Sequence, residues 1–271
     1  MSSMIVGVIG VGVVGSAASH GFRKLGHTVV EHDVKYKTVI QDIAETSICF
    51  ICVPTPSRPD GSCNTEIVEE VVAELAAIGY KGIVAVKSTV EPGTTIKLQE
   101  RHTELEICFV PEFLRERCAI SDFIDNHDLC VVGTDNKQVF EVVKGCHGYY
   151  PKKFECVGPT EAELVKYFNN IYNATLITFA NNFYEVCEVL GADYTSIKNA
   201  VVQRDHITNS YLDCNKNLRG FGGVCLPKDT KAINNLVKRE GLPCGLFETV
   251  LRENDRYITT VFDGMRLGEE E

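Results

Sequence analysis

The sequence has no run of about 18 uninterrupted apolar residues, so we expect no transmembrane helix. It begins with a short apolar segment that lacks a basic region, which argues against a signal peptide and favours a cytoplasmic location. Lys and Arg number 27 against 37 Asp and Glu, which gives a net charge of −10. Nucleic-acid binding relies on clustered basic residues that displace counterions from phosphates, so we expect neither nucleic acid nor a membrane as a partner.

Most of the 12 cysteines stand inside apolar runs such as residues 48–53, where a reduced cysteine behaves as a small hydrophobic side chain. Cys49 and Cys52 form a C-x-x-C pair. Residues three apart on a strand point to opposite faces of a sheet, however, so the two thiols would not meet. We therefore expect no metal site.

The first half of the chain alternates short apolar runs with helix-like stretches. The runs cover residues 4–9, 28–32, 48–53, 83–87, 107–110 and 129–133. Strands that alternate with helices predict an α/β fold with a doubly wound parallel sheet, on which dinucleotides commonly bind. Because 271 residues exceed the usual length of one domain, we expect a dinucleotide-binding domain over residues 1–158 and a helical domain over residues 159–271.

A helical pattern without Pro or Gly covers residues 160–190. Thr160 and Glu163 have the spacing of a capping box, which predicts the start of this helix, and Gly191 predicts its end. A helix of this length usually spans a domain or an interface.

A glycine motif follows the first strand. Residues 10–15 fit G-x-G-x-x-G, with Val11, Val13 and Val14 between Gly10, Gly12 and Gly15. The three glycines respectively permit a tight turn, the approach of a pyrophosphate and the close packing of the next helix. Asp33, at the end of the next strand, can accept a hydrogen bond from a ribose 2′-hydroxyl and would repel a 2′-phosphate, so NAD is the predicted cofactor. Glu31 lies on the same strand face and stays an alternative for this role.

Residues 220–229, Gly-Phe-Gly-Gly-Val-Cys-Leu-Pro-Lys-Asp, form a second glycine-rich segment. Glycines leave space for a substrate, and Pro227 suits the first turn of a helix, which places Cys225 at the helix N-terminus. The helix dipole favours a thiolate there, so Cys225 is the predicted nucleophile. Asp229, one turn further along, can steer a water molecule or accept a proton.

The sequence resembles the UDP-glucose/GDP-mannose dehydrogenase family in six ordered blocks. They are residues 10–15, 53–56, 87–90, 111–116, 163–170 and 220–229. The resemblance implies a Rossmann domain followed by an all-helical central domain, and a homodimer built around the long helix. It also implies oxidation of the C6 alcohol of a nucleotide sugar, UDP-glucose first of all, to a carboxylate with two NAD molecules. The reaction would pass through a thiohemiacetal and then a thioester on Cys225.

The resemblance further implies individual roles. Lys166 and Asn170 would form the oxyanion-binding pair, in agreement with their spacing of one helical turn. Glu112 and Glu116 would be the acid/base and substrate-positioning carboxylates. Thr89 would lie near the water that hydrolyses the thioester. Glu112 or Asp229 would help to activate this water. The cofactor-binding set adds Val53, Pro54, Thr55, Thr89 and Glu116 to the glycine motif and Asp33. The substrate-binding set is Glu112, Leu114, Glu116, Lys166, Asn170, His206, Phe221, Gly222, Gly223 and Cys225.

Two departures from the family bear on the substrate. Full-length members carry a third, Rossmann-like domain that grips the nucleotide, and we expect no such domain after about residue 258. Part of the substrate site is then missing, supplied by another chain, or unnecessary for a different substrate. His206 stands where the family has an arginine from the neighbouring subunit, and histidine lacks the bidentate fork of a guanidinium group.

Two other functions stay open. A Rossmann domain followed by a helical domain is also the plan of the β-hydroxyacid dehydrogenases, which use a lysine without a catalytic cysteine. Alternatively, the chain is a non-catalytic homologue that binds NAD and assembles with a full-length partner. The segment around Cys225 argues against the first alternative, and the presence of every chemical residue argues against the second.

Overall fold

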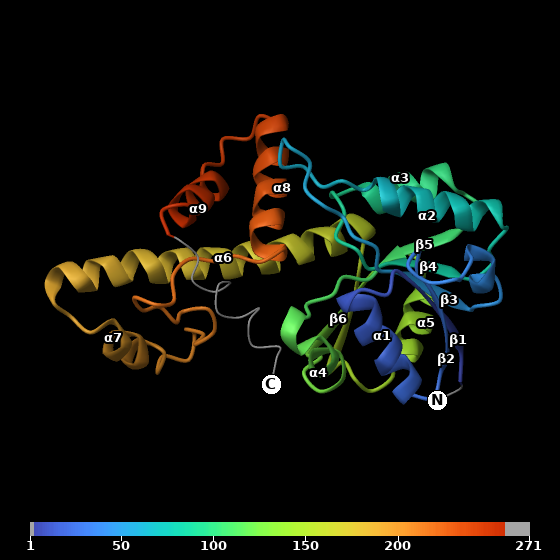
Figure 1. Ribbon diagram of the computed structural model, residues 1–271, viewed down its shortest axis with the longest axis horizontal. Coiled ribbons are helices and arrows are strands. Elements are labelled where there is room, and N and C mark those ends of the chain that lie inside the picture. Colours follow the sequence, from blue (N-terminus) through green and yellow to red (C-terminus); the bar gives the residue numbers. More distant parts are fainter. Residues whose placement is uncertain (1–2, 258–271) are drawn as a thin grey trace. The chain divides into compact units, whose positions relative to one another are not determined.

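The computed structural model describes residues 3–257, and the chain divides into two compact units (Figure 1). The first unit comprises Met1–Pro56 and Cys63–Lys166, and the second comprises Ser57–Ser62 and Tyr167–Glu271. The predicted domain boundary at residue 158 immediately precedes the long helix α6, Pro159–Leu190, which belongs to the first unit as far as Lys166. The segment after about residue 258, where we expect no third domain, lies outside the described residues.

The first unit is built on one sheet with the strand order β2-β1-β3-β4-β5-β6-β7. The strands are β1 (Ile5–Ile9), β2 (Thr28–His32), β3 (Ile48–Ile51), β4 (Ile83–Val86), β5 (Glu106–Phe109), β6 (Leu129–Gly133) and β7 (Lys153–Val157). The six predicted strands and the doubly wound α/β class are confirmed. The apolar pattern does not predict β7, because this strand lies at the sheet edge and exposes most of its positions.

Strands β2, β1, β3, β4 and β5 pair in parallel, whereas β5 and β6 pair antiparallel. The chain from residue 110 to residue 128 therefore stays at the end of the sheet where β1, β3 and β4 also finish. β2 and β3 pair with opposite edges of β1, so the strand order reverses its direction beside β1. In open α/β sheets, ligands bind outside the carboxyl ends of the strands at such a switch point.

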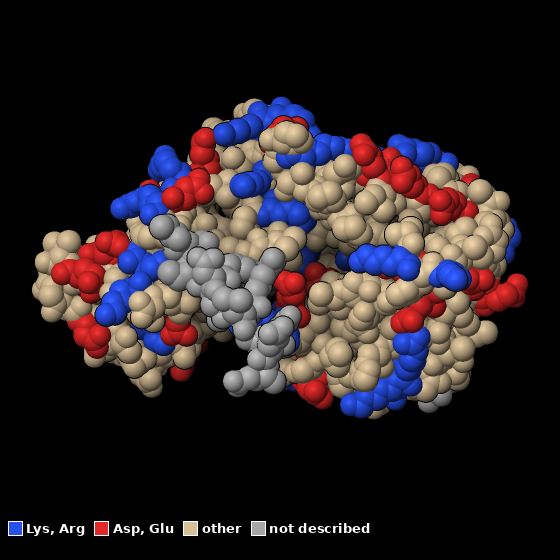
Figure 2. All heavy atoms as spheres, viewed as in Figure 1, with Lys and Arg blue, Asp and Glu red and all other residues tan. Residues whose placement is uncertain are grey.

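Helices cover both faces of this sheet (Figure 1). One face carries α1 (Val13–Lys24), α4 (Ala119–Ile124) and α5 (Lys137–His147), and the other carries α2 (Glu66–Ala77) and α3 (Thr94–Arg101). Two 3₁₀ turns, η1 (Ile40–Ile43) and η2 (Glu116–Cys118), complete the first unit. The amphipathic pattern of α2 explains its place, because Val68, Val72 and Leu75 face the core, and Figure 2 shows acidic side chains on the surface in the region of α2 and α3.

The second unit contains the rest of α6 with α7 (Tyr194–Val201), α8 (Cys225–Arg239) and α9 (Leu246–Asn254). This agrees with the helical region that we predicted. Gly191 has φ +66°, a left-handed conformation that ends α6 at the predicted place. Within residues 3–257 no helix combines the length and the apolar character needed to cross a membrane. The cytoplasmic location stays a prediction.

The predicted capping box at the start of α6 is wrong. Pro159 begins the helix, so Thr160 already lies inside its first turn. The Glu163 carboxylate instead accepts hydrogen bonds from the Gly93 and Thr95 amides and from the Thr95 hydroxyl (2.6 Å). It therefore caps the N-terminus of α3 from a distant part of the chain. Burial raises the pKa of Glu163 above its ordinary value.

Loss of this cap should destabilise the first unit. Glu163→Ala leaves buried donors of α3 without an acceptor, so we expect the free energy of unfolding to fall by about 2 kcal/mol. Urea unfolding followed by circular dichroism measures the change. Glu100→Ala, which removes an exposed carboxylate from α3 itself, is the matched control. Equal losses in the two variants would contradict the capping role.

Two histidines lie within or beside the aromatic core of the first unit. His147 is fully buried, with its ring 5.3 Å from the Phe22 ring and 5.9 Å from the His127 ring. Burial, followed by the positive charge of Lys87, lowers the pKa of His127 to about 4. The same two causes hold the pKa of His147 well below its ordinary value. The folded state therefore keeps both rings neutral.

Acid should weaken the first unit through these rings. The unfolded chain takes up protons below about pH 6.5 and the folded chain does not, so stability falls as the pH drops from there towards 4. We expect a slope of up to about 1.4 kcal/mol per pH unit for each histidine. Urea unfolding at a series of pH values tests this. His147→Phe should flatten the slope and His20→Phe, at an exposed position on α1, should leave it unchanged.

Candidate active site

The glycine motif forms the turn between β1 and α1. Gly10 has φ +87°, and a Cβ atom there would lie 2.9 Å from the backbone of Cys52 and Val53. A Cβ atom on Gly15 would lie 2.0 Å from the Gly10 carbonyl oxygen, so the close packing predicted for this helix is confirmed. Open space surrounds the position of a Cβ atom on Gly12, as an approaching ligand requires.

The turn fits the pyrophosphate of a dinucleotide. Helix α1 has no side-chain cap at Gly12 and no acidic residue in its first turn, so its first amide groups and its dipole can act on an anion. Of the three valines between the glycines, Val13 is 46% exposed beside this helix end. The backbone at this turn would therefore hold the phosphates of NAD.

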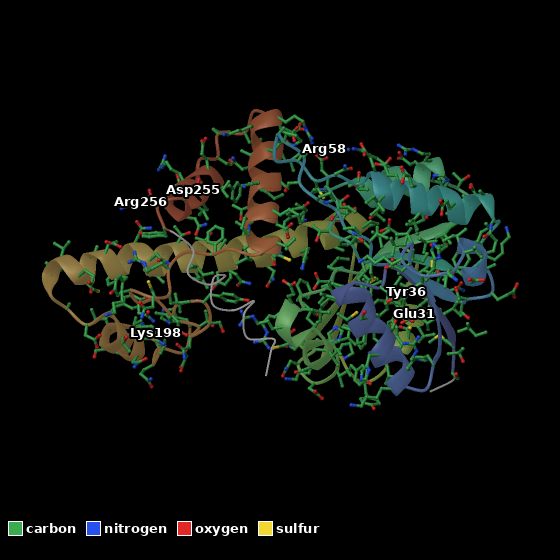
Figure 3. The ribbon with its side chains drawn as sticks, in the orientation of Figure 1. Glu31, Tyr36, Arg58, Lys198, Asp255 and Arg256 are labelled. Carbon is green, nitrogen blue, oxygen red and sulfur yellow. The ribbon has the colours of Figure 1, made fainter. Side chains whose placement is uncertain are left out.

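Asp33 follows β2 and lies against the glycine turn. Its carboxylate accepts hydrogen bonds from the Val11 amide (2.7 Å) and the Lys35 amide (2.9 Å). The bond from the Lys35 amide is the main cause that lowers the pKa of Asp33. The alternative residue, Glu31, labelled in Figure 3, pairs with Arg23 at 3.0 Å. Asp33 is therefore the better placed of the two to meet a ribose beside the turn.

The carboxyl ends of β3 and β4 meet beside this turn. The Ser88 hydroxyl donates to the carbonyl oxygens of Val53 (2.7 Å) and Ile51 (3.2 Å), which ties the two strand ends together. Pro54 is exposed and Thr55 is buried in the loop that follows β3. Thr89, predicted to lie near the hydrolytic water, is half-buried at the end of β4. The predicted cofactor residues of these blocks thus lie at the carboxyl ends of the strands.

Glu112 and Lys166 form a buried ion pair in the first unit. Their Oε1 and Nζ atoms are 2.8 Å apart, and the two side chains are 11% and 5% exposed. Lys166 also donates to the Glu112 carbonyl oxygen, and the Leu114 amide donates to Glu112 Oε2 (2.7 Å). Burial alone would raise the pKa of Glu112, but the charge and hydrogen bond of Lys166 hold it below its ordinary value. Glu112 is therefore a carboxylate at neutral pH.

The loop after Glu112 is braced by an ion pair. Arg115 donates to Asp122 through Nε (2.9 Å) and through a terminal guanidinium nitrogen (2.7 Å). This bidentate pair fixes the loop that carries Leu114. Glu116, at the start of η2, is exposed, as a residue that contacts a ligand can be.

In the second unit Cys225 is the first residue of α8, as predicted, and it is exposed. Asp229 lies one turn further along and is fully buried. Its carboxylate accepts a hydrogen bond from Asn170 Nδ2 (2.6 Å) and lies 2.7 Å from Lys228 Nζ. An exposed thiol at a helix N-terminus above a fixed carboxylate is an arrangement suited to nucleophilic catalysis.

The other predicted substrate residues of this unit differ in exposure. Phe221 is 2% exposed, so its side chain belongs to the apolar core. Gly222 and Gly223 are half-buried, and Gly223 has φ +84°, which requires glycine. His206 is exposed in the chain that follows α7.

Each predicted oxyanion donor faces a carboxylate within its own unit. Lys166 meets Glu112 and Asn170 meets Asp229, partners that the resemblance does not imply. Lys228, which pairs with Asp229, was also missed. Its signal was its position between Pro227 and Asp229 in the first turn of α8, where a lysine is unfavourable unless a carboxylate accompanies it.

Two family descriptions match the chain. Residues 34–149 match the NAD binding domain of the UDP-glucose/GDP-mannose dehydrogenase family, and residues 160–256 match its central domain. NAD is thus confirmed as the cofactor that goes with the first domain. The UDP-glucose 6-dehydrogenase of Rickettsia felis is 29% identical over 82% of this chain and 50% of its own length. That of Haloferax volcanii is 27% identical over 97% of this chain and 72% of its own.

Solved structures agree with these matches. A UDP-glucose dehydrogenase from Pyrobaculum islandicum is 29% identical, with a TM-score of 0.86 over 94% of this chain and 68% of that one. A 3-hydroxyisobutyrate dehydrogenase from Mycobacterium tuberculosis shares the fold at 14% identity, with a TM-score of 0.76. The chain spans about half the length of the first curated relatives that it matches. The two matched domains together show that the chain belongs to the UDP-glucose/GDP-mannose dehydrogenase family.

Proposed function

We propose that this chain oxidises the C6 alcohol of a nucleotide sugar, UDP-glucose, to the carboxylate with NAD. The observation that carries the proposal is the exposed Cys225 at the start of α8, one turn from the buried Asp229. A β-hydroxyacid dehydrogenase needs no such thiol. The family membership of both domains supports the same activity, with residues 1–158 as the NAD-binding domain and residues 159–271 as the central domain.

The first unit would hold NAD, which would supply the hydride acceptor for each of two oxidations, so that one alcohol, two NAD⁺ and one water would give one carboxylate, two NADH and three protons. The Cys225 thiolate adds to the carbonyl carbon of the intermediate aldehyde and forms a thiohemiacetal. Loss of the second hydride leaves a thioester, and water then releases the acid and restores the thiol.

The polar residues divide the remaining work. Lys166 and Asn170 donate hydrogen bonds to the oxygen that becomes negative when the thiolate adds. Glu112 accepts the proton that the alcohol loses, for which its ionised state suits it. Asp229 keeps Asn170 in place and, with Thr89, positions the hydrolytic water. Each of these groups binds, orients or accepts a proton, and Cys225 alone forms a covalent bond.

Product stoichiometry tests the proposal. Purified protein with NAD and UDP-glucose should yield two NADH for each sugar acid formed. If the protein formed NADH from a small hydroxy acid, and if the Cys225→Ala variant did so at the same rate, the result would favour a β-hydroxyacid dehydrogenase. NAD binding without turnover of any nucleotide sugar, alone or with a full-length partner, would favour the non-catalytic homologue.

We also propose that two copies associate through α6. A stripe of exposed apolar side chains runs along its part in the second unit at spacings of three, four and seven residues. It comprises Phe168, Tyr172, Phe179, Phe183, Val186 and Leu190, which are between 39% and 76% exposed. A continuous apolar stripe on one helix face marks a protein interface.

Charge on this stripe should separate the copies. Phe168→Glu places a carboxylate on the most exposed member of the stripe, so we expect the mass measured by light scattering to fall from that of a dimer to that of a monomer. Glu188→Lys changes the charge of another exposed position on the same helix outside the stripe, and should leave the mass unchanged. A wild-type monomer would contradict the proposed dimer.

A further inference from the structure

Side-chain amides from two helices hold the start of the glycine-rich segment in the second unit. Asn254, the last residue of α9, accepts a hydrogen bond from the Phe221 amide at Oδ1 (2.7 Å) and donates from Nδ2 to the Phe221 carbonyl oxygen (2.8 Å). Asn181 of α6 accepts from the Gly220 amide (3.1 Å) and from Arg219 Nε (2.8 Å). The backbone of Gly220 and Phe221 is thereby tied to α6 and α9.

The pair of bonds from Asn254 sets the position of Phe221 along the chain. One primary amide satisfies both the N–H and the C=O of the same residue, as a neighbouring β-strand would. Packing also holds the Phe221 side chain, because its ring lies in the apolar cluster formed with Ala174 and Val250. Phe221 therefore cannot shift or turn without breaking two hydrogen bonds in a largely buried place.

Only three residues separate this anchor from Cys225. Two of them are glycines, which hold no conformation by themselves, and Gly223 has φ +84°. On the far side of Cys225, the buried Asp229 fixes the first turn of α8 through Asn170. The thiol thus stands at the end of a short, flexible segment that is secured at Phe221 and in α8.

We propose that Asn254 is a positioning residue of the nucleophile segment. It acts through the backbone of Phe221, so that Gly222 and Gly223 keep the shape in which the substrate is bound and Cys225 keeps its place at the α8 N-terminus. The inference rests on the proposed function for its effect on substrate binding, and its effect on the thiol can be measured without turnover.

Two substitutions of Asn254 differ in the hydrogen bonds that they allow to Phe221. Asn254→Ala removes both hydrogen bonds, whereas Asn254→Asp keeps an acceptor for the Phe221 amide and opposes a carboxylate to the Phe221 carbonyl oxygen. Asp255→Ala is the matched control, because Asp255 is the next residue and is exposed at the end of α9 (Figure 3). Asn254→Asp also serves as the test variant if Asn254→Ala does not fold.

The reactivity of Cys225 gives a readout that a general loss of stability would not move. Trypsin releases residues 220–228, in which Cys225 is the only cysteine, so its alkylation by iodoacetamide can be followed by mass spectrometry well below the melting temperature. We expect the alkylation rate of Cys225 in Asn254→Ala to fall by about threefold or more, because the thiol leaves its preferred place at the helix end. Asn254→Asp should fall between Asn254→Ala and the wild type, and Asp255→Ala should equal the wild type.

Kinetics give the second readout. We expect Asn254→Ala to raise the KM for UDP-glucose about tenfold, while the Kd for NAD, measured by calorimetry, stays unchanged because NAD contacts the other unit. Wild-type alkylation rates and KM in Asn254→Ala, with only a lower melting temperature, would overturn the inference, as would equal losses in Asp255→Ala. Failure of the wild type to oxidise UDP-glucose would instead contradict the proposed function, and the alkylation comparison would still decide the role of Asn254.

Discussion

Cys225→Ala is expected to reduce formation of the sugar acid by at least about 10³-fold, because it removes the thiol that holds the intermediate aldehyde as a covalent adduct. The Kd for NAD should stay unchanged, since the glycine turn and Asp33 lie in the first unit. Quantifying the acid by mass spectrometry and NAD binding by calorimetry separates the two effects.

Cys244→Ala is the control for this experiment. Cys244 is also exposed in the second unit, and it follows α8 instead of beginning it. Its loss should leave the yield of acid unchanged. Acid formation by Cys225→Ala at a rate near that of the wild type would remove Cys225 from the mechanism, although the family membership would stand.

Lys166→Met should lower the free energy of unfolding by about 3–5 kcal/mol at pH 8, because it leaves the Glu112 carboxylate buried without its cation. The pH dependence of the contribution that Glu112 makes to stability should also reverse. With Lys166 present, the pKa of Glu112 is lower in the folded protein than in the unfolded chain. The Glu112 carboxylate therefore stabilises the fold above its unfolded pKa, and this stabilisation is lost as the pH falls through the folded pKa. Without Lys166, burial raises the pKa of Glu112, so the loss of stability relative to the wild type should be smaller at pH 5 than at pH 8. Urea unfolding at pH 8 and pH 5 measures both effects.

Two further variants check the cause. Lys166→Met combined with Glu112→Gln should recover part of the lost stability, because it removes the unpaired charge. Lys24→Met, at an exposed position at the end of α1, should change the free energy of unfolding by less than about 0.5 kcal/mol. A Lys166→Met variant as stable as the wild type at pH 8 would show that the ion pair does not hold Glu112 in its ionised form.

Much of the frame could be predicted from the sequence because its signals are local. Apolar runs and glycine spacing identify six strands and the turn at Gly10, and Pro227 identifies the start of α8. Strand β7 gave no such signal, since an edge strand with exposed positions needs no apolar run. The predicted cap between Glu163 and Thr160 was wrong for a related reason. Its spacing from Thr160 fits a local cap, yet its partners, Gly93 and Thr95, lie about 70 residues earlier in the chain.

The sequence by itself determined six of the seven strands in the sheet, the glycine turn and the places of Cys225 and Asp229 one turn apart on α8, since each depends on residues only a few positions away. The tertiary structure alone decided which groups meet the charged side chains. Lys166 contacts Glu112 across 54 residues of chain, Asn170 contacts Asp229 across 59, and Asn254 holds Phe221 across 33. The physical reason is that a buried polar group takes the partner that packing brings within about 3 Å, and no spacing along the chain specifies that partner.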